Sequence, residues 1–419
     1  MDIKIAVVVP EYFTERSEGG GLASFGDFLV EALGSKPGWS ADVVSPRMWH
    51  AAPEGRRVLD PKTWLRGVTT SARRVGDTEV TYVGANWSEF EFMRYAPRKK
   101  LNDVLNTYDA VIGVFGTPAQ CLMLRSLSVP AIAQIATLID LERGQLLKSL
   151  RGVRWLLAKA NTYITARLDE KGLQVPNRLM VINDWMFDYC RERVGSRVAL
   201  APPGIDTDFF VPLGEVSGLE GRNSPTPPSP SSNFLFVGRL ADPRKDIKSL
   251  LRAYSRACVM FDLPQKLILA GRGDIQLEEY QLITELGLGG RVEIIKDVSK
   301  DQLRELYQRA DLLVLSSAEE GLGIVLLEAM ACGIPVVSSA TEGARYAVGD
   351  SDVGSLINLG PRFVEELAAS LGEWAMDPTA RRRAGINARK RVLDTFSYEV
   401  ASQMYVDTLR EIVVSLESE

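Results

Sequence analysis

Two glutamates and a pair of glycines stand close together in the segment SAEEGLGIVLLEAMACGIPVVSS, residues 317–339. Glu320 precedes a Gly-Leu-Gly loop, and Glu328 follows Glu320 by eight positions, in the helix that we expect after the loop. Glycines let a backbone approach a ligand closely, and the unpaired N–H groups at a helix start favour an anion. We therefore predict a phosphate or oxyanion site, with both carboxylates accepting hydrogen bonds from sugar hydroxyls. The backbone N–H groups in question belong to Leu322, Gly323 and Ile324.

Two cations precede this segment in the chain. Arg239 lies in the apolar run FLFVGRL, residues 234–240, and Lys245 follows six residues after it, before an expected helix. Ligands of open α/β sheets bind outside the carboxyl ends of the strands, so both cations would face one crevice. A guanidinium fork and a compact ammonium charge together suit a diphosphate. Each cation alone is typical of a solvent-exposed loop, and the combination with Glu320 and Glu328 favours the diphosphate.

A glycine run follows the first apolar segment, Ile3 to Val9. Gly20, with Gly19 or Gly21, would bring backbone amides of a first domain to the same phosphates, and a flexible loop is the alternative. The spacing is not G-x-G-x-x-G, and no acid ends the second strand-like segment, ADVVSP. Both features count against a dinucleotide site.

Two positions after later strand-like segments belong to the same expected site. Gly271 ends the segment KLILAG, and we expect it in a tight turn near a nucleotide. The base is expected against the end of segment 291–298, at Val298 or its neighbours. Ordinary loop residues would look the same there, so this second expectation rests on position alone.

Four segments, taken together, resemble the retaining glycosyltransferases of family 4, also called glycosyl transferases group 1, which have the GT-B fold. EGLGIVLLE is similar to the E-x7-E motif of this family, and VGRLADPRKD is similar to its V-G-R-L…K-G segment. APPGIDTDFFVP resembles the interdomain P-N-G-I-D…F-x-P segment, and EGGGLASFGDFLVEAL resembles the glycine loop of the first domain. The matches follow the family's order along nearly the whole chain and are strongest between residues 201 and 340.

The resemblance implies transfer of a hexose from a nucleotide diphosphate sugar, UDP- or GDP-linked, with retention of the anomeric configuration. It implies that Arg239 and Lys245 neutralise the leaving diphosphate. It also implies that Glu328 holds the ribose and that Glu320 holds the transferred hexose. No metal and no further cofactor is expected, because the two cations take the metal's role. The acceptor, which could be a small molecule, phosphosugar, lipid or glycan, would bind the first domain.

One departure from the family concerns histidine. Many relatives carry a histidine at the end of a first-domain strand, where Ala136 or Thr137 falls in this chain, and the sole histidine, His50, lies elsewhere. Retaining transfer needs no protein base, because the leaving diphosphate can accept the acceptor's proton while the enzyme orients the reactants and stabilises charge. The missing histidine also supports an alternative, a catalytically inactive GT-B-shaped subunit that binds sugar nucleotides or a partner.

The elements that must position these residues alternate between strand-like and helical segments, as in a doubly wound α/β fold. We expect two Rossmann-like parallel-sheet domains, which the resemblance places across a cleft from each other as a GT-B fold. They would span 1–205 and 234–394, with a linker at 206–233. An amphipathic helix at about 395–419 would pack back on the first domain. Strand-like segments lie at 3–9, 41–45, 79–84, 110–115, 131–136, 163–166 and 179–182, and then at 234–240, 266–273, 291–298, 311–317, 334–339 and 353–358.

Composition excludes several other classes of protein. Of the 419 residues, 46% are hydrophobic and 25% are charged, as in an ordinary globular protein. The net charge of −5 argues against a chain-wide nucleic-acid role, and one histidine cannot build a multi-histidine zinc site. Four widely spaced cysteines without a C-x-x-C pair indicate reduced thiols in a cytoplasmic protein. No apolar stretch is long enough for a signal peptide or a membrane span.

The first expected domain carries a basic and aromatic region between residues 47 and 100. Eleven Lys or Arg stand there against six acids, and RGVRWLLAKA at 151–160 adds another basic, apolar stretch. One hypothesis is an anionic acceptor, or peripheral contact with the inner face of a membrane. The other, which the sequence favours, is a solvated face with a few aromatics in the core. Whether the protein forms a homo-oligomer stays open.

Overall fold

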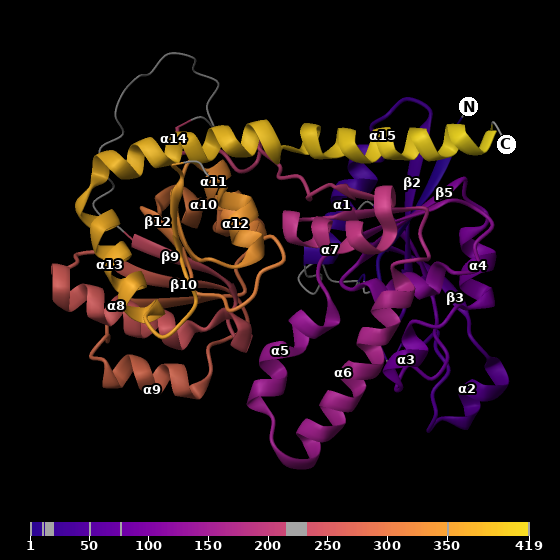
Figure 1. Cartoon of the computed structure of the whole chain (residues 1–419), viewed down its shortest axis with the longest axis horizontal. Helices are drawn as coiled ribbons and strands as arrows, with labels where there is room; N and C mark the ends of the chain where they lie inside the picture. Colours follow the sequence, from indigo (N-terminus) through magenta and orange to yellow (C-terminus); the bar gives the residue numbers. More distant parts are fainter. Residues whose placement is uncertain are drawn as a thin grey trace. The chain divides into compact units, whose positions relative to one another are not determined.

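The computed structural model divides into two compact units of chain (Figure 1). The first comprises Met1–Gly204 and Tyr398–Glu419, and the second comprises Ile205–Ser397. The structure describes residues 2–10, 12, 21–49, 52–75, 78–214, 233–349 and 352–417. Gly19, Gly20 and His50 thus lie outside the described residues.

The first unit is built on an eight-stranded sheet with the order β3-β4-β2-β1-β5-β6-β7-β8. All neighbouring strands are parallel except β3 and β4, which pair antiparallel at one edge. The strands are β1 (Ile3–Val8), β2 (Trp39–Pro46), β3 (Thr70–Val75), β4 (Thr78–Val83), β5 (Ala110–Phe115), β6 (Ala131–Ile135), β7 (Arg178–Val181) and β8 (Val198–Leu200). Their continuous apolar runs are typical of strands that are covered on both faces.

Helices bury apolar residues against both faces of this sheet. Phe28 of α1 and Tyr405 of α15 belong to one apolar cluster, whereas Leu105 of α4 and Met186 of α7 belong to the other. The helical segments of the unit are α1 (Gly21–Gly34), α2 (Pro61–Arg66), α3 (Glu91–Arg94), α4 (Lys99–Leu105), η2 (Pro118–Leu124), α5 (Ile139–Ser149), α6 (Gly152–Gly172), α7 (Asp184–Val194), η3 (Gly195–Arg197) and α15 (Tyr398–Glu417).

The last helix, α15, packs within the first unit although it follows the second unit in sequence. The fully buried hydroxyl of Tyr405 lies 2.6 Å from Gln134 Oε1 and 2.9 Å from the carbonyl oxygen of Ala201. The helix therefore covers apolar surface of the sheet and also provides a partner for a buried amide side chain.

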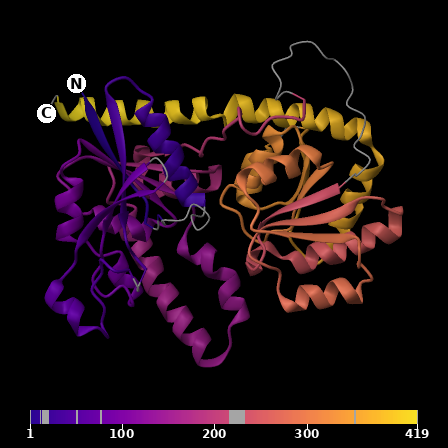
Figure 2. The ribbon, with the colours of Figure 1, turned by 180° about the vertical axis from the view of Figure 1, so that it is seen from behind.

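The second unit is built on a six-stranded parallel sheet with the order β11-β10-β9-β12-β13-β14 (Figure 2). This is the Rossmann order, in which the strand sequence reverses between β9 and β12. The strands are β9 (Asn233–Arg239), β10 (Lys266–Arg272), β11 (Val292–Lys296), β12 (Leu312–Leu315), β13 (Val336–Ser339) and β14 (Gly354–Ile357). The helical segments are η4 (Pro243–Lys245), α8 (Ile247–Phe261), α9 (Leu277–Glu285), α10 (Lys300–Arg309), α11 (Ile324–Ala331), α12 (Glu342–Val348), α13 (Phe363–Met376) and α14 (Pro378–Thr395). The predicted α/β architecture with two doubly wound sheets is confirmed.

One predicted strand is wrong. The segment at 163–166 lies inside the 21-residue helix α6. Its β-branched threonine is accommodated because Thr165 Oγ1 donates to the carbonyl oxygen of Asn161, one turn earlier, at 2.8 Å. The short strands β3 and β8 were not predicted, since β3 is a mostly exposed edge strand and β8 has only three residues.

The beginning of the expected linker packs inside the second unit. Arg389 donates to the carbonyl oxygens of Thr207 and Phe210 at 3.1 and 2.8 Å, and Phe210 is buried against Tyr307. The aromatic residues of this stretch are thus part of a core, whereas residues 215–232 lie outside the described residues.

Candidate active site

Two loops meet at the point where the strand order of the second sheet reverses. One follows β9 and contains Lys245, and the other follows β12 and contains Glu320. The loops are joined by two hydrogen bonds, from Ala318 N to Arg244 O at 2.7 Å and from Ser316 Oγ to Lys245 O at 2.8 Å. Because β9 and β12 are parallel neighbours, both loops lie at the same edge of the sheet.

Lys245 and Glu320 form a partly buried ion pair. Lys245 Nζ lies 2.5 Å from Glu320 Oε1, and the two side chains are 14% and 12% exposed. Ser317 Oγ donates to the same oxygen at 2.6 Å. The pair places a positive and a negative group at one point, so an oxyanion could bind Nζ while a neighbouring hydroxyl donates to the carboxylate.

Arg239, the last residue of β9, is more exposed and has a partner that was not predicted. Its Nη2 lies 2.6 Å from Asp242 Oδ2, which also accepts from Arg244 Nη2 at 2.8 Å. Burial opposes ionisation of Asp242, but the hydrogen bonds from Arg244 and the charges of both arginines hold its pKa below its ordinary value. Asp242 would therefore compete with a phosphate for Arg239. The clue in the sequence was Asp242, an acid three positions after Arg239 and two before Arg244.

Glu328 lies on α11 and is bonded to a residue of α10. Tyr307, which is fully buried, donates from its hydroxyl to Glu328 Oε2 at 2.7 Å. Burial raises the pKa of Glu328 to about 7, against the opposing effects of the Tyr307 hydrogen bond and the charge of Lys300. Sequence analysis did not predict that Tyr307 orients this carboxylate. In the sequence, Tyr307 stands out only as a residue of the apolar pattern of a helix.

The raised pKa of Glu328 predicts how the stability of the fold depends on pH. The folded chain holds the Glu328 proton up to about pH 7, whereas the ordinary value is 4.5, so stability should fall as the pH rises through this interval. Glu328→Gln removes the titration. We expect the wild type to lose about 1–2 kcal/mol relative to this variant between pH 4.5 and 7.5, a figure reduced because Glu328 is only partly buried. Urea unfolding at several pH values measures the difference, with Glu293→Gln, an exposed residue of β11, as control. Parallel pH profiles for wild type and Glu328→Gln would contradict the assigned environment.

The loop between the two glutamates is held by glycines. Gly323, which follows the buried Leu322, has φ +76° and is the N-cap of α11, which begins at Ile324. A Cβ on Gly343 of α12 would lie 2.5 Å from the carbonyl oxygen of Glu320, and Gly343 N donates to this oxygen at 3.2 Å. The close approach of α12 thus fixes the backbone of the loop, a contact that was not predicted.

The end of β10 lies beside that of β9, and the end of β11 lies on the other side of β10. Gly271 has φ +144°, and a Cβ there would lie 1.9 Å from the carbonyl oxygen of Gly238. Asp297 N donates to Gly271 O at 2.6 Å, and Val298 follows directly, before the helix α10 begins. The structure therefore places Gly271 and Val298 at the same sheet edge as Arg239.

The expected first-domain residues are less well described. Gly20 lies outside the described residues, and Gly21 begins α1. Ala136 and Thr137 follow β6 and donate from their backbone nitrogens to Phe115 O and Gly116 O at 3.1 and 2.9 Å. In the part of the chain that the structure describes, no group of three or more His, Cys, Asp or Glu side chains could hold a metal ion.

Comparison with known sequences shows what the second unit is similar to. Residues 220–391 match the family model described as glycosyl transferases group 1. The chain is 33% identical over 186 residues to a D-inositol 3-phosphate glycosyltransferase of Mycolicibacterium smegmatis. It is 30% identical over 234 residues to an MMP alpha-(1->4)-mannosyltransferase of Mycolicibacterium hassiacum. These alignments cover 43% and 55% of this chain, and the chain spans only 38% and 53% of the two relatives.

Solved structures share the fold over almost the whole chain. Sucrose-phosphate synthase from Thermosynechococcus elongatus matches with a TM-score of 0.70 and 20% identity, over 99% of this chain and all of that one. HepE from Anabaena, in complex with UDP-glucose, matches with a TM-score of 0.67 and 17% identity, over 98% of this chain and all of that one. The chain therefore has the two-domain α/β fold of GT-B type, as predicted.

Proposed function

We propose that the chain is a retaining glycosyltransferase that moves a hexose from a UDP- or GDP-linked sugar to an acceptor. The observation that carries this proposal is the contact between Lys245 and Glu320 at the strand-order reversal of a group 1 glycosyltransferase domain. A cation suits the departing diphosphate, and an adjacent carboxylate suits the hydroxyls of the transferred sugar.

The remaining residues of the site have complementary roles in this proposal. Lys245 and Arg239 neutralise the negative charge that develops on the diphosphate as the bond from sugar C1 to the phosphate oxygen breaks. The acceptor oxygen bonds to C1 on the same face, and its proton passes to the leaving phosphate oxygen. Glu328 accepts hydrogen bonds from the ribose, and Gly271 and Val298 lie near the base. The N–H groups of the loop contact the diphosphate, and they belong to Leu322, Gly323 and Ile324.

The names of the similar proteins support the proposed donor and the proposed acceptor. One relative is named for inositol phosphate and another for mannosyl transfer, and HepE was solved with UDP-glucose. A nucleotide-sugar donor and a polyol or sugar acceptor, with or without a phosphate, fit this set. In the proposed reaction the cationic side chains take the role of a metal, so no metal and no further cofactor is required.

The test is an assay of the purified chain with a panel of UDP-glucose, UDP-N-acetylglucosamine and GDP-mannose. We expect one donor to raise the melting temperature and to be hydrolysed slowly, with release of UDP or GDP and of the retained anomer. A donor present at 100 times its Kd stabilises a protein by about 2.7 kcal/mol, which thermal shift detects readily. No stabilisation and no hydrolysis with any donor would overturn the proposal.

A second candidate is a subunit that binds sugar nucleotides without turning them over. The observation in its favour is that β6 is followed by Ala136 and Thr137, where many relatives carry histidine. Thermal stabilisation by a donor, without hydrolysis and without transfer to any sugar or polyol offered, would identify this function. Release of UDP or GDP would exclude it.

We further propose peripheral contact of the first unit with an anionic membrane, through α6. Val153, Leu156 and Leu157 are 71%, 60% and 67% exposed, and the helix projects with α5 from the sheet of the first unit (Figure 1). The stretch 151–168 contains basic residues and no acid. Exposed apolar residues flanked by cations match the lipid boundary beneath anionic headgroups. None of the described helices is both long and apolar enough to cross a membrane.

Vesicle flotation tests this contact. We expect the chain to bind vesicles that contain phosphatidylglycerol and to leave them at high salt. Leu156→Ser with Leu157→Ser should reduce binding about tenfold or more, because each leucine loses the free energy of apolar burial. Val259→Ser with Met260→Ser removes two exposed apolar residues from α8 and serves as control. Equal binding by both double variants would contradict a docking role for α6.

A further inference from the structure

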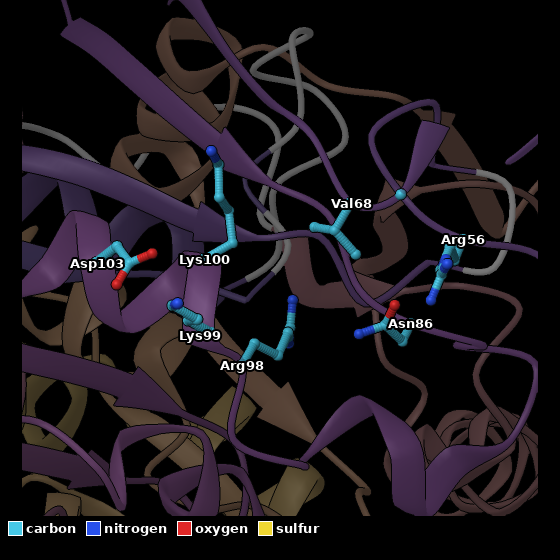
Figure 3. A pocket seen from close by; sticks show the side chains of 8 residues that line it. Arg56, Val68, Asn86, Arg98, Lys99, Lys100 and Asp103 are labelled. Carbon is cyan, nitrogen blue, oxygen red and sulfur yellow. The ribbon is translucent and has the colours of Figure 1, made fainter. Parts of the chain in front are cut away.

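A cationic pocket of about 330 Å³ lies in the first unit (Figure 3). It opens between the segment after β2, the segment after β4 and the beginning of α4. Four cations line it together with one amide and one carboxylate, and these residues are Arg56, Arg98, Lys99, Lys100, Asn86 and Asp103. None of them belongs to the site in the second unit.

The fold places this pocket at the ligand-binding edge of the first sheet. The segments carrying Arg56 and Asn86 run side by side, since Arg56 N donates to Ala85 O and Trp87 N donates to Arg56 O, both at 2.8 Å. They follow β2 and β4, which are parallel neighbours, so both leave the sheet at its carboxyl edge. Ligands of open α/β sheets bind at this edge.

Arg98 is the buried cation of the pocket and has only neutral partners. Arg98 is only 4% exposed. Its Nη1 donates to Gly84 O at 3.0 Å, and its Nη2 donates to Met123 Sδ at 3.1 Å. Among the described residues, its Nε has no hydrogen-bond partner and its guanidinium has no carboxylate. Burial lowers the pKa of Arg98 to about 10, so it is still charged at neutral pH. A buried charge without a counter-ion is costly, and an anion in the pocket offsets that cost.

The neighbouring cations are also without acidic partners. Within the described ranges, Arg56, Lys99 and Lys100 form no ion pair, and Arg56 Nε has no hydrogen-bond partner. Four positive charges stand against the single carboxylate of Asp103. Figure 3 shows the ends of the Arg98 and Asn86 side chains facing one space, with Lys99 and Lys100 beyond Arg98 and the Lys100 ammonium directed away from it. Guanidinium and ammonium donors around such a space suit a phosphate dianion.

We propose that this pocket binds the phosphate group of a sugar-phosphate or polyol-phosphate acceptor. The charge excess matches a dianion better than a carboxylate, and the residues that line the described pocket include no aromatic ring to stack a base. The open side leaves room for the sugar beyond its phosphate. The identity of the ligand as the acceptor rests on the proposed function, whereas the phosphate site itself does not.

The test measures binding in the absence of any donor. By calorimetry, we expect the full chain to bind glucose 6-phosphate and inositol 1-phosphate more tightly than inorganic phosphate, and not to bind glucose. The double variant Lys99→Ala with Lys100→Ala should bind the sugar phosphates about tenfold or more weakly than the wild type, as expected for the loss of charged donors. Both lysines are exposed, so this variant should fold. Arg382→Ala with Arg383→Ala removes an adjacent pair of exposed cations from α14 and should change binding less than about twofold.

Three results would overturn the proposal. These are no phosphate binding by the wild type, equal losses in both double variants, or sugar phosphates that bind no more tightly than inorganic phosphate. The outcome is independent of turnover. If no donor is hydrolysed but the Lys99 and Lys100 variant loses sugar-phosphate binding, the phosphate site is supported and the proposed transferase function is contradicted. If a donor is hydrolysed and both double variants bind sugar phosphate equally well, the transferase function is supported and the assignment of the pocket is contradicted.

Discussion

Replacing Lys245 with methionine is expected to abolish measurable transfer and to weaken binding of UDP or GDP about 10- to 100-fold. Methionine keeps the length and apolar stem of lysine but removes the charge that would face the diphosphate in the proposed site. The same change leaves the Glu320 side chain, only 12% exposed, with Ser317 as its remaining hydrogen-bond partner among the described residues. A carboxylate that loses its counter-ion in this position repels the phosphate, so the loss should exceed that of one hydrogen bond.

Measurements of binding and of turnover distinguish the roles of Lys245 and Glu320. Glu320→Gln keeps an acceptor for Ser317 but removes the negative charge, so we expect it to retain the nucleoside diphosphate while losing hydrolysis and transfer. Lys248→Met, on the adjacent helix α8, is the matched control for Lys245→Met, and it should bind like the wild type. Thermal unfolding without ligand verifies that each variant folds. Unchanged affinity of Lys245→Met for the diphosphate would remove this residue from the site.

The second large effect is expected from Gly271→Ala. The glycine has φ +144°, and an added Cβ would lie 1.9 Å from the carbonyl oxygen of Gly238, on the neighbouring strand. Both groups are backbone, and the two residues pair in the ladder between β9 and β10, so neither can move aside. Strained φ and overlap together should destabilise the second unit by more than about 3 kcal/mol. Because Leu240 N donates to Arg272 O across the same strands, the displacement should also weaken diphosphate binding at Arg239.

Gly289→Ala is the control for this variant. A Cβ there has nothing within 4 Å, and Gly289 has no positive φ, so stability should change by less than about 0.5 kcal/mol. Urea unfolding measures both variants, and hydrogen exchange on peptides from residues 233–300 shows whether the loss is confined to the second unit. Similar midpoints for Gly271→Ala and Gly289→Ala would mean that the strand end adopts another backbone path.

All six described strands of the second unit could be predicted because each is a compact apolar run, most of them bounded by glycine or charged residues. The segments at 234–240 and 266–273 are such runs, and they form β9 and β10. The same criterion failed at 163–166, where four residues of strand-like type lie within a longer helical sequence. It also missed β3, whose side chains are mostly exposed, because an edge strand held by pairing alone carries little apolar signal.

By itself, the sequence determined which residue types stand at the carboxyl ends of the strands, and with them our proposal that Arg239, Lys245 and the two glutamates bind a diphosphate sugar. Only the tertiary structure decided the partners of these residues. Glu320 meets Lys245, 75 positions earlier, and Glu328 meets Tyr307, because the pairing of β9 with β12 and the packing of α10 bring these elements together. Contacts of this kind depend on register and on helix packing, which no local pattern of residues encodes. The cationic pocket of the first unit arises in the same way, from three segments that are separate in the chain and adjacent in the fold.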